Sequence, residues 1–482
     1  MTKRAVSVII AAPGSLLWSI SVPDPWATSR VAGVDLHLDL RGHGLRDGLA
    51  NALRDAVRNG RLAPGTKLPS SRTLAADLGI ARNTVAQAYT ELVAEGWLTA
   101  QQGSATRVTR RGTETVPAAA APARPANQRH RYDLRPGQPD LSTFPRAAWA
   151  KATRRALTQA PDEAFGYGEP LGRPELRAAL AAYLARTRGV HTHPDRIVIC
   201  SGVSHGLTLL TQVLRRRAIA VEAYGLYVHR ELLASLGFRT VPLPLDEHGA
   251  RVDRLDEADV GAVLLTPSHQ FPTGVALRPD RRAAVVDWAR RTGGLVIEDD
   301  YDGEFRYDRH PVGALQGLDP EHVVYLGTAS KSLAPGLRLA WMALPARLVH
   351  AVTAVKGERD RTTATTDQLA MAEFLTSGAY DRHVRAMRLH YRRRRDQLVE
   401  ALAARAPGAR VTGITAGLHL LIELPSGNES AAVRSPDLAV YGLDRFRHPD
   451  TPAERDALVI GYGTPSASAW PGALEALCRV LP

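Results

Sequence analysis

Lysine is rare in this chain of 482 residues, so the position of each lysine is informative. The sequence has five lysines against 56 arginines. One of them, Lys331, lies among small residues in TASKSLAPGLRLAW (328–341), directly after an apolar run. A primary amine can lose its proton and form a Schiff base with an aldehyde, which a guanidinium cannot do. Lys331 is therefore a candidate for capturing an aldehyde, and a lone surface lysine is the alternative.

An acidic cluster follows another apolar run, LVI (295–297). It consists of Glu298, Asp299 and Asp300, and Tyr301 comes directly after it. Such a cluster suits a bound metal ion or a solvated loop, and it also suits a carboxylate that pairs with a cationic ring nitrogen. The cluster alone leaves these alternatives open.

A third stretch, VICSGVSHGL (198–207), has the pattern of a strand that enters a Gly/Ser turn and then a helix. Backbone N–H groups at such a helix start bind phosphate, although many α/β proteins share this turn. Arg338, seven residues after Lys331, adds a cation. Pyridoxal 5'-phosphate (PLP) needs an amine for its aldehyde, a carboxylate for its ring nitrogen and cationic donors for its phosphate. Lys331, Asp299 and Arg338 together predict a PLP site.

The elements that position these groups are apolar runs that alternate with helical stretches from Tyr132 onward. The runs are RIVICSG (196–202), GAVLLTP (261–267), GGLVIEDD (293–300) and HVVYLGT (322–328). Continuous apolar runs between helices are typical of buried strands in a mostly parallel α/β sheet. Ligands bind at the carboxyl ends of such strands. We therefore expect the amine, the carboxylate and the phosphate turn to meet at one edge of a sheet.

Residues 35–108 form a separate unit with three predicted helices and a hairpin. Apolar residues spaced by four predict the first helix over 45–60. Ser70 or Ser71 caps the second helix, which Gly79 ends. The third helix begins near Arg82, and WLTAQQGSATRVT (97–109) forms a hairpin around Gly103. The apolar positions of the first and third helices are Leu45, Leu49, Leu53 and Val57, then Val85, Ala88, Tyr89, Leu92 and Val93.

This order of elements is a winged helix-turn-helix, whose last helix fits the major groove of duplex DNA. Its N-terminal residues Arg82, Asn83 and Thr84 are placed to contact base edges. A protein-docking module is the alternative. The wing offers further contacts to phosphates or to the minor groove, through Gln101, Gln102, Ser104 and Arg107.

The positive charge of the chain lies mostly in its first quarter. Residues 1–131 carry 17 Lys and Arg against 9 Asp and Glu, and the other residues carry 44 against 40. A basic unit suits a polyanion, with a solvated basic face as the alternative. Residues 109–131 are rich in Ala, Pro and Arg, which predicts a mobile linker.

The first residues of the chain, the length of its apolar runs and its cysteines bear on where the protein is located. Residues 1–34 begin like a secretion signal, but Pro13 and Gly14 interrupt the apolar run. We interpret them as a disordered extension, or as the product of a start codon placed too far upstream. No apolar stretch is long enough to span a bilayer. Cys200 and Cys478 are too far apart for a disulfide framework or a metal site, so buried thiols in a reducing cytoplasm are expected.

Two resemblances to known families cover residues 36–482. LAPGTKLPSSRTLAADLGIARNTVAQAYTELVAEGWL (62–98) resembles the DNA-binding domain of the GntR family. TPSHQFPTG (266–274), VIEDDYDGEFRY (296–307) and YLGTASKSLAPGLRLAW (325–341) resemble fold-type I aminotransferases, specifically the MocR/GabR branch of GntR regulators. The resemblance implies a winged helix, a linker and, over 132–482, an aminotransferase-like α/β domain with a small C-terminal subdomain.

The resemblance also implies roles for single residues. Lys331 would bind the PLP aldehyde, Asp299 the ring nitrogen and Tyr301 the ring 3-hydroxyl. The phosphate would lie among Ser204, His205, Ser330 and Arg338. The DNA contacts would come from Arg72, Arg82, Asn83 and Thr84, and from the wing around Gly103. No metal site is expected. Members of this branch resemble head-to-tail dimers in which PLP is a sensed ligand.

The sequence departs from the aminotransferase pattern at two positions. The tyrosine that stacks on the PLP ring is replaced by Leu226, with Tyr224 or Tyr227 as substitutes. The arginine that clamps a substrate carboxylate is replaced by Val459. A cation for the substrate carboxylate could then come only from the preceding loop, from Arg445, Arg447 or Arg455.

These departures decide between the functional hypotheses. We expect a transcription regulator that binds duplex DNA and senses PLP or a PLP–amine adduct, with control of vitamin B6 or amine metabolism as the biological role. Amine exchange on PLP is expected to survive, whereas full transamination and catalytic residues are not expected. The alternatives are a working aminotransferase with an attached DNA-binding module, and a scaffold that binds no PLP.

Overall fold

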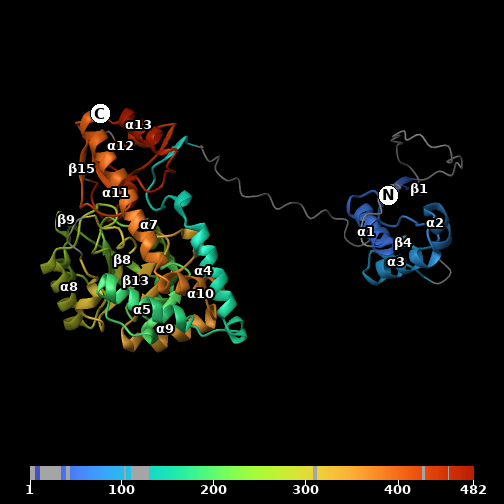
Figure 1. Cartoon of the computed structure of the whole chain (residues 1–482), viewed down its shortest axis with the longest axis horizontal. Coiled ribbons are helices and arrows are strands. Elements are labelled where there is room, and N and C mark those ends of the chain that lie inside the picture. Colours follow the sequence, from blue (N-terminus) through green and yellow to red (C-terminus); the bar gives the residue numbers. More distant parts are fainter. Residues whose placement is uncertain are drawn as a thin grey trace. The chain divides into compact units, whose positions relative to one another are not determined.

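The computed structural model divides the chain into two compact units, residues 1–127 and 128–482 (Figure 1). The division falls inside the predicted linker. Among the helices in the described part of the chain, none combines the length and the apolar character that a bilayer crossing requires. The structure describes residues 6–10, 34–38, 44–101, 105–109, 130–307, 312–425, 429–453 and 455–481.

The first unit contains the predicted helices and hairpin. They are α1 (Leu45–Arg58), α2 (Ser71–Leu78), α3 (Arg82–Ala94), β3 (Leu98–Thr99) and β4 (Arg107–Val108). Ser70 caps α2, because its Oγ accepts a hydrogen bond from the backbone N–H of Thr73 at 3.1 Å. Gly79 ends α2 in the left-handed conformation, with φ +65°. The caps confirm the helix boundaries that the sequence predicts here.

The first unit differs from the sequence prediction at its start. Within the segment expected to be a disordered extension, Val6–Ile10 forms strand β1, which pairs antiparallel with β2 (Val34–Leu38). Both segments are rich in Val, Ile and Leu, which suit a pleated surface once a partner strand is present. The structure describes only part of the predicted wing, because Gln102, Gly103 and Ser104 lie outside the described residues.

A seven-stranded sheet forms the centre of the second unit. Its strands are parallel except β14, which runs antiparallel to both of its neighbours. The sheet confirms the predicted, mostly parallel α/β architecture. Its order is β6 (Ile197–Cys200), β14 (Ala340–Ala343), β13 (Val323–Thr328), β12 (Leu295–Asp299), β11 (Ala262–Leu265), β7 (Ala218–Glu222) and β8 (Arg239–Leu243).

Both faces of this sheet are buried. Along β12, Val296 and Ile297 point to opposite faces and join different hydrophobic clusters. The inner strands are therefore mostly apolar before their carboxyl ends, which explains the continuous apolar runs of the sequence. Helices cover the two faces: α4 (Arg146–Gln159), α5 (Pro174–Arg188), α6 (Val203–Val213), α7 (Tyr227–Ser235), α8 (Pro279–Thr292), α9 (Ala346–Arg359) and α10 (Thr365–Thr376).

The C-terminal part of the second unit forms a smaller layer of its own. Its antiparallel sheet has the order β15 (Arg410–Thr412), β16 (His419–Glu423), β19 (Ala457–Gly461) and β18 (Tyr441–Gly442). The sheet packs with α11 (Ala379–Arg405), α12 (Glu429–Val433) and α13 (Trp470–Val480), which lie together at one end of this unit in Figure 1. The start of the unit joins this layer, because β5 (Tyr132–Asp133) pairs with β17 (Leu438–Ala439). Both cysteines are free and buried, as predicted.

Candidate functional site

A cavity of about 340 Å³ opens at the carboxyl ends of the parallel strands. This is the edge at which α/β sheets bind ligands. Six of the seven residues that the sequence assigns to the cofactor line its wall: Ser204, Asp299, Tyr301, Ser330, Lys331 and Arg338. They come from the end of β12, from the first turn of α6, and from the loops that follow β12 and β13.

Lys331 lies three residues after the end of β13, on the cavity wall. Its Nζ donates a hydrogen bond to the carbonyl oxygen of Gly137 at 2.6 Å. Burial lowers the pKa of the Lys331 amine below its usual value, and the charge of Asp299 opposes this shift. A lowered pKa raises the fraction of neutral amine, which is the form that reacts with an aldehyde.

The partners of the three consecutive carboxylates separate their roles. Glu298 accepts two backbone N–H bonds, at 2.7 and 2.9 Å, from the turn that begins at Leu315. Asp300 forms a bidentate pair with Arg188, at 2.7 and 2.9 Å. The Oδ1 atom of Asp299 is buried and has no hydrogen-bond partner among the described residues. The three carboxylates therefore do not form one acidic site. Among the three, only Asp299 has a buried oxygen without a hydrogen-bond partner in the described chain.

The surroundings of the Asp299 carboxyl favour a partner that carries a proton. Burial raises the pKa of its carboxyl to about 7, against the opposing effect of Lys331. His229 Nδ1 lies 3.9 Å from Asp299 Oδ2, and burial lowers the pKa of His229 to about 4, so this histidine is neutral near pH 7. A cationic ring N–H would satisfy the open Oδ1. The PLP ring nitrogen therefore fits this position.

The phosphate end of the cavity is built around the start of α6. Gly202 precedes the helix with φ +142°, and a Cβ there would lie 2.8 Å from Nη2 of Arg338. Within the described chain, no ion pair or side-chain hydrogen bond is formed by the exposed guanidinium of Arg338. Ser204 and Ser330 lie on the same wall. Helix-start N–H groups beside an unpaired guanidinium fit a phosphate group.

His205 is placed beside the cavity and not on its wall. Its Nδ1 accepts a hydrogen bond from the backbone N–H of Ser201 at 3.1 Å. Its Nε2 lies 3.4 Å from Asp360 Oδ2. His205 therefore holds the turn before Gly202 in place, and a direct phosphate contact is not its role in this geometry.

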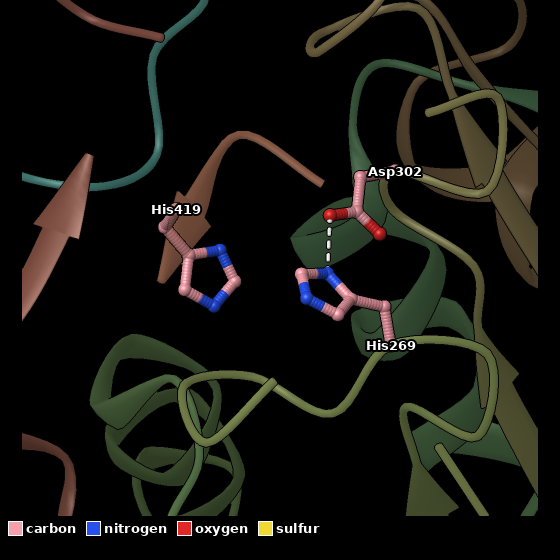
Figure 2. A group of neighbouring side chains, drawn as sticks. All are labelled: His269, Asp302 and His419. Carbon is pink, nitrogen blue, oxygen red and sulfur yellow. Dashed lines mark hydrogen bonds and ion pairs between the residues drawn. The ribbon is translucent and has the colours of Figure 1, made fainter. Parts of the chain in front are cut away.

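Tyr301 is supported by a cluster of two histidines and a carboxylate (Figure 2). His269 Nδ1 lies 2.8 Å from Asp302 Oδ2, the contact dashed in Figure 2. The same nitrogen lies 3.1 Å from the hydroxyl of Tyr301. The ligand atoms of His269, Asp302 and His419 lie within 4.8 Å of one another, a grouping that also suits a metal ion. Because Nδ1 of His269 is already bonded to Asp302, we interpret these two residues as a hydrogen-bonded support for Tyr301. The ring of His419 packs against that of His269, with 4.8 Å between the centroids.

Of the two departures from the aminotransferase pattern, Leu226 lies on the cavity wall and Val459 does not. Leu226 and Tyr227 both line the cavity. Tyr224 is buried in a hydrophobic cluster that also contains Val459. Of the two tyrosines considered as substitutes, Tyr227 is thus the one on the wall. Val459 is fully buried and brings no charge to the site.

Several wall residues were missed by the sequence analysis. They share no local signal, because they come from elements that only tertiary folding brings to this edge. His229 lies on α7, and His419 and Tyr441 lie on strands of the small sheet. A histidine or tyrosine inside an apolar segment is indistinguishable from an ordinary core residue in sequence. The missed residues include Gly137, Glu222, His229, Arg230, Thr266, His419 and Tyr441.

In the first unit, the predicted DNA contacts lie at the starts of α2 and α3. Arg72, Arg82 and Asn83 are exposed, and Thr84 is half-buried. Arg107 donates a hydrogen bond to the carbonyl oxygen of Gly65 at 2.9 Å, which ties the wing to the turn before α2. Exposed basic and amide side chains at a helix start suit base edges in a major groove.

Family comparisons match both units. The family of bacterial regulatory proteins, gntR family, matches residues 45–108. The family of aminotransferases class I and II matches residues 131–440. The two matches follow the division of the chain into its compact units.

Single relatives and a solved structure agree with the family matches. YdeL, an uncharacterised HTH-type transcriptional regulator of Bacillus subtilis, is 34% identical over 83% of this chain and 89% of its own. The HTH-type pyridoxine biosynthesis transcriptional regulator PdxR of Corynebacterium glutamicum is 32% identical, over 86% of this chain and 91% of its own. The crystal structure of Pyrococcus horikoshii kynurenine aminotransferase, in complex with PMP, has a TM-score of 0.66 at 26% identity, covering 73% of this chain and 90% of that chain.

Proposed function

Because this chain belongs to the GntR family of bacterial transcription regulators, we propose that its cofactor pocket controls its affinity for an operator. Within that family the chain belongs to the MocR/GabR branch, which carries an aminotransferase class I and II domain. The chain is a DNA-binding regulator whose large unit has the fold of PLP-dependent aminotransferases. The proposal is that binding of PLP, and of an amine that reacts with it, shifts the affinity of the winged helix for duplex DNA.

One observation carries the proposal. The amine of Lys331, the open Oδ1 of Asp299 and the unpaired guanidinium of Arg338 lie on the wall of the same cavity. The buried acceptor of Asp299 without a partner is costly unless a ligand satisfies it. The exposed guanidinium of Arg338 is open to an anion. PLP offers a group that satisfies each one.

The residues of the pocket then have separate tasks. When bound, PLP supplies an aldehyde that takes up primary amines. Lys331 holds that aldehyde through Nζ, and Asp299 keeps a proton on the ring nitrogen. Arg338 and the start of α6 at Ser204 bind the phosphate. The hydroxyl of Tyr301, positioned by its histidine partner, binds the ring oxygen.

We further propose that the pocket senses amines and does not turn them over. Transamination needs the amino acid held so that its reacting C–H bond is aligned with the ring. The buried Val459 provides no cation for a substrate carboxylate. The competing function is a working aminotransferase, which the fold permits. Incubation with amino donors and 2-oxo acids distinguishes the two: we expect negligible new amino acid, and turnover of about 1 per second or faster would establish an enzyme.

The proposed partners follow from both units. The winged helix binds a duplex operator in the cytoplasm, and the large unit forms a head-to-tail homodimer. Exposed apolar side chains in residues 141–167 support a protein interface: Leu141, Leu157, Phe165 and Tyr167 are exposed, Tyr167 by 91%. The named relative PdxR supports control of vitamin B6 synthesis, with amine metabolism as the other candidate.

The cofactor assignment is tested by spectroscopy of purified protein with added PLP. Wild-type protein should show a visible absorbance band that borohydride bleaches, since reduction would turn the conjugated C=N double bond to the lysine into a C–N single bond. Lys331→Ala should lose this band. Lys151→Ala, which removes an exposed lysine on α4, should keep it. A Lys331→Ala protein with the same reducible band would overturn the assignment.

A further inference from the structure

One of the five lysines of the chain is fully buried and has no part in the site described above. Lys356, near the end of α9, has a side chain that is 0% exposed. Its Nζ has no hydrogen-bond partner among the described residues, and it lies 3.7 Å from Oδ2 of Asp360. Burying an ammonium group costs free energy, and an apolar side chain of similar length would avoid this cost. A function explains this lysine better than stability does.

A series of polar contacts leads from Lys356 to the phosphate end of the cavity. Oδ2 of Asp360 lies 3.4 Å from Nε2 of His205. Because Nδ1 of His205 accepts the backbone N–H of Ser201, the proton of the neutral imidazole is on Nε2 and faces the carboxylate. The Asp360 carboxylate thus orients the histidine ring, and the ring holds the turn before Gly202.

The end of α9 is itself fixed beside this turn. The backbone N–H of Asp360 donates a hydrogen bond to the carbonyl oxygen of Lys356 at 3.0 Å, which closes the last turn of the helix. Three residues later, Thr363 Oγ1 donates to the carbonyl oxygen of Ile199 in β6 at 3.3 Å. These bonds keep the Asp360 carboxylate close to His205.

The negative charge of Asp360 is unfavourable at this place. His205 lies in the first turn of α6, where the helix start and Arg338 fit a phosphate group. A carboxylate behind a phosphate-binding turn repels the phosphate. Burial lowers the pKa of His205, so this ring does not supply a cancelling charge. The Asp360 carboxylate favours the charged form of the Lys356 amine against the effect of burial on its pKa, so Lys356 can cancel the charge.

From these contacts we propose that Lys356 is a positioning residue for the phosphate: its buried ammonium neutralises Asp360, so that this carboxylate orients His205 without repelling the ligand. The proposal rests on the proposed function, which places the phosphate of PLP at the start of α6. Lys356 is not among the residues that line the cavity. It acts through Asp360 and His205, and a ligand without a phosphate group does not depend on it.

The test compares PLP with pyridoxal, which has the same ring and aldehyde but no phosphate, on the full-length protein freed of bound PLP. Dissociation constants come from calorimetry and from the absorbance of the bound ligand. Lys356→Met should weaken PLP binding by about tenfold and leave pyridoxal affinity unchanged, since only the phosphate meets the uncancelled charge. Lys151→Met, which replaces an exposed lysine of α4, should keep both wild-type affinities.

A second substitution assigns the effect to the charge of Asp360. Lys356→Met combined with Asp360→Asn should recover most of the wild-type PLP affinity, because the repelling charge is removed. Far-ultraviolet circular dichroism checks the fold of each variant, and Lys356→Gln, with the same expected affinities, takes the place of a Lys356→Met protein that does not fold.

Three results would overturn the proposal: unchanged PLP affinity in Lys356→Met, equal losses for PLP and pyridoxal, or a double variant as weak as Lys356→Met. Failure of the wild type to bind PLP at all would instead contradict the proposed function.

Discussion

At the level of single residues, the pocket is defined by which polar atoms lack a partner. Three carboxylates stand in a row at the end of β12, and the sequence alone leaves their roles open. Glu298 is satisfied by backbone N–H groups and Asp300 by Arg188. Asp299 is left with an open Oδ1 in a buried environment that raises its pKa to about 7. Unsatisfied acceptors therefore identify the ligand-binding carboxylate better than its charge does.

The raised pKa of Asp299 predicts a pH dependence of PLP affinity. In the cofactor-free protein the carboxyl is protonated below about 7, whereas pairing with a cationic ring nitrogen needs the ionised form. Binding therefore releases a proton at low pH, and affinity should fall by up to about tenfold per pH unit below that value. Equilibrium dialysis of PLP at a series of pH values measures this slope.

The variant Asp299→Asn separates this carboxyl from other titrating groups. The phosphate of PLP and the amine of Lys331 titrate in both proteins, so their contributions cancel in the comparison. Asp299→Asn should bind PLP more weakly at pH 8 and show a flatter slope below pH 7. Parallel curves for the two proteins would show that Asp299 does not titrate with binding.

The site residues that the sequence predicts are those with a local signal. Lys331 stands out because lysine is rare, and Asp299 and Arg338 follow apolar runs at informative spacing. His229 and Tyr441 could not be predicted as site residues, because their positions on the cavity wall depend on α7 and the small sheet meeting there. Long-range packing, and not local pattern, brings them there.

At the level of elements, buried polar pairs fix the sheet edge that carries the site. Arg188, near the end of α5, forms its bidentate pair with Asp300 and also donates to Ser268 Oγ at 2.9 Å. Tyr325 of β13 adds a hydrogen bond to Asp300 at 2.8 Å. One side chain thus links a helix to two strand ends beside Asp299. This network makes α5 part of the support of the pocket.

Removing the arginine of this network should be costly. Arg188→Ala leaves Asp300 buried without its counterion, so the free energy of unfolding should fall by about 3–5 kcal/mol. Arg186→Ala on the same helix removes an exposed pair with Asp381 and should cost about 1 kcal/mol or less. Urea unfolding followed by circular dichroism measures both. Equal losses of unfolding free energy in the two variants would show that the buried pair stabilises the fold no more than the exposed pair does.

The third helix of the first unit is the element expected to enter the major groove. If Arg82 contacts a guanine edge, Arg82→Ala should weaken operator binding by about 1–3 kcal/mol and relax specificity at one base pair. Arg46→Ala, on α1 and paired with Asp47, should bind normally. Fluorescence anisotropy with an operator selected from a random pool measures the change, and unaltered binding by Arg82→Ala would falsify the placement of the recognition helix.

The elements were predictable to the extent that their apolar pattern is strong. The strands of the central sheet are buried on both faces, so each appears as an uninterrupted apolar run. Helix α2 of the first unit is bounded by Ser70 and Gly79, and the structure contains both caps. Strand β1 was missed because Val6–Ile10 is short and its partner, Val34–Leu38, is distant in sequence. Pairing at that separation leaves no local signal.

At the level of the whole molecule, the two units divide recognition of DNA from recognition of the ligand. The basic excess lies in residues 1–131, and the cavity lies entirely in residues 128–482. The proposed dimer would place two DNA-binding units on one operator, which would make the oligomeric state part of the function.

The dimer is expected to depend on the exposed apolar residues of the large unit. Phe165 and Tyr167 are exposed by 53% and 91%. The double variant Phe165→Ser and Tyr167→Ser should shift the protein toward monomer in analytical ultracentrifugation, while its far-ultraviolet spectrum stays unchanged. Tyr132, half-buried within β5, serves as the control position: Tyr132→Phe should remain dimeric. A double variant that remains fully dimeric would place the interface elsewhere.

The central claim is that the pocket around Lys331 controls DNA binding, and operator affinity measured with and without PLP tests it most directly. The measurement uses full-length wild type and Lys331→Ala, with Lys151→Ala as the control. Wild type and Lys151→Ala should change their operator dissociation constant on addition of PLP, by a factor set by the coupling between the two sites. Lys331→Ala should show no such change. Equal operator affinity with and without PLP in the wild type, or a full response in Lys331→Ala, would contradict the account.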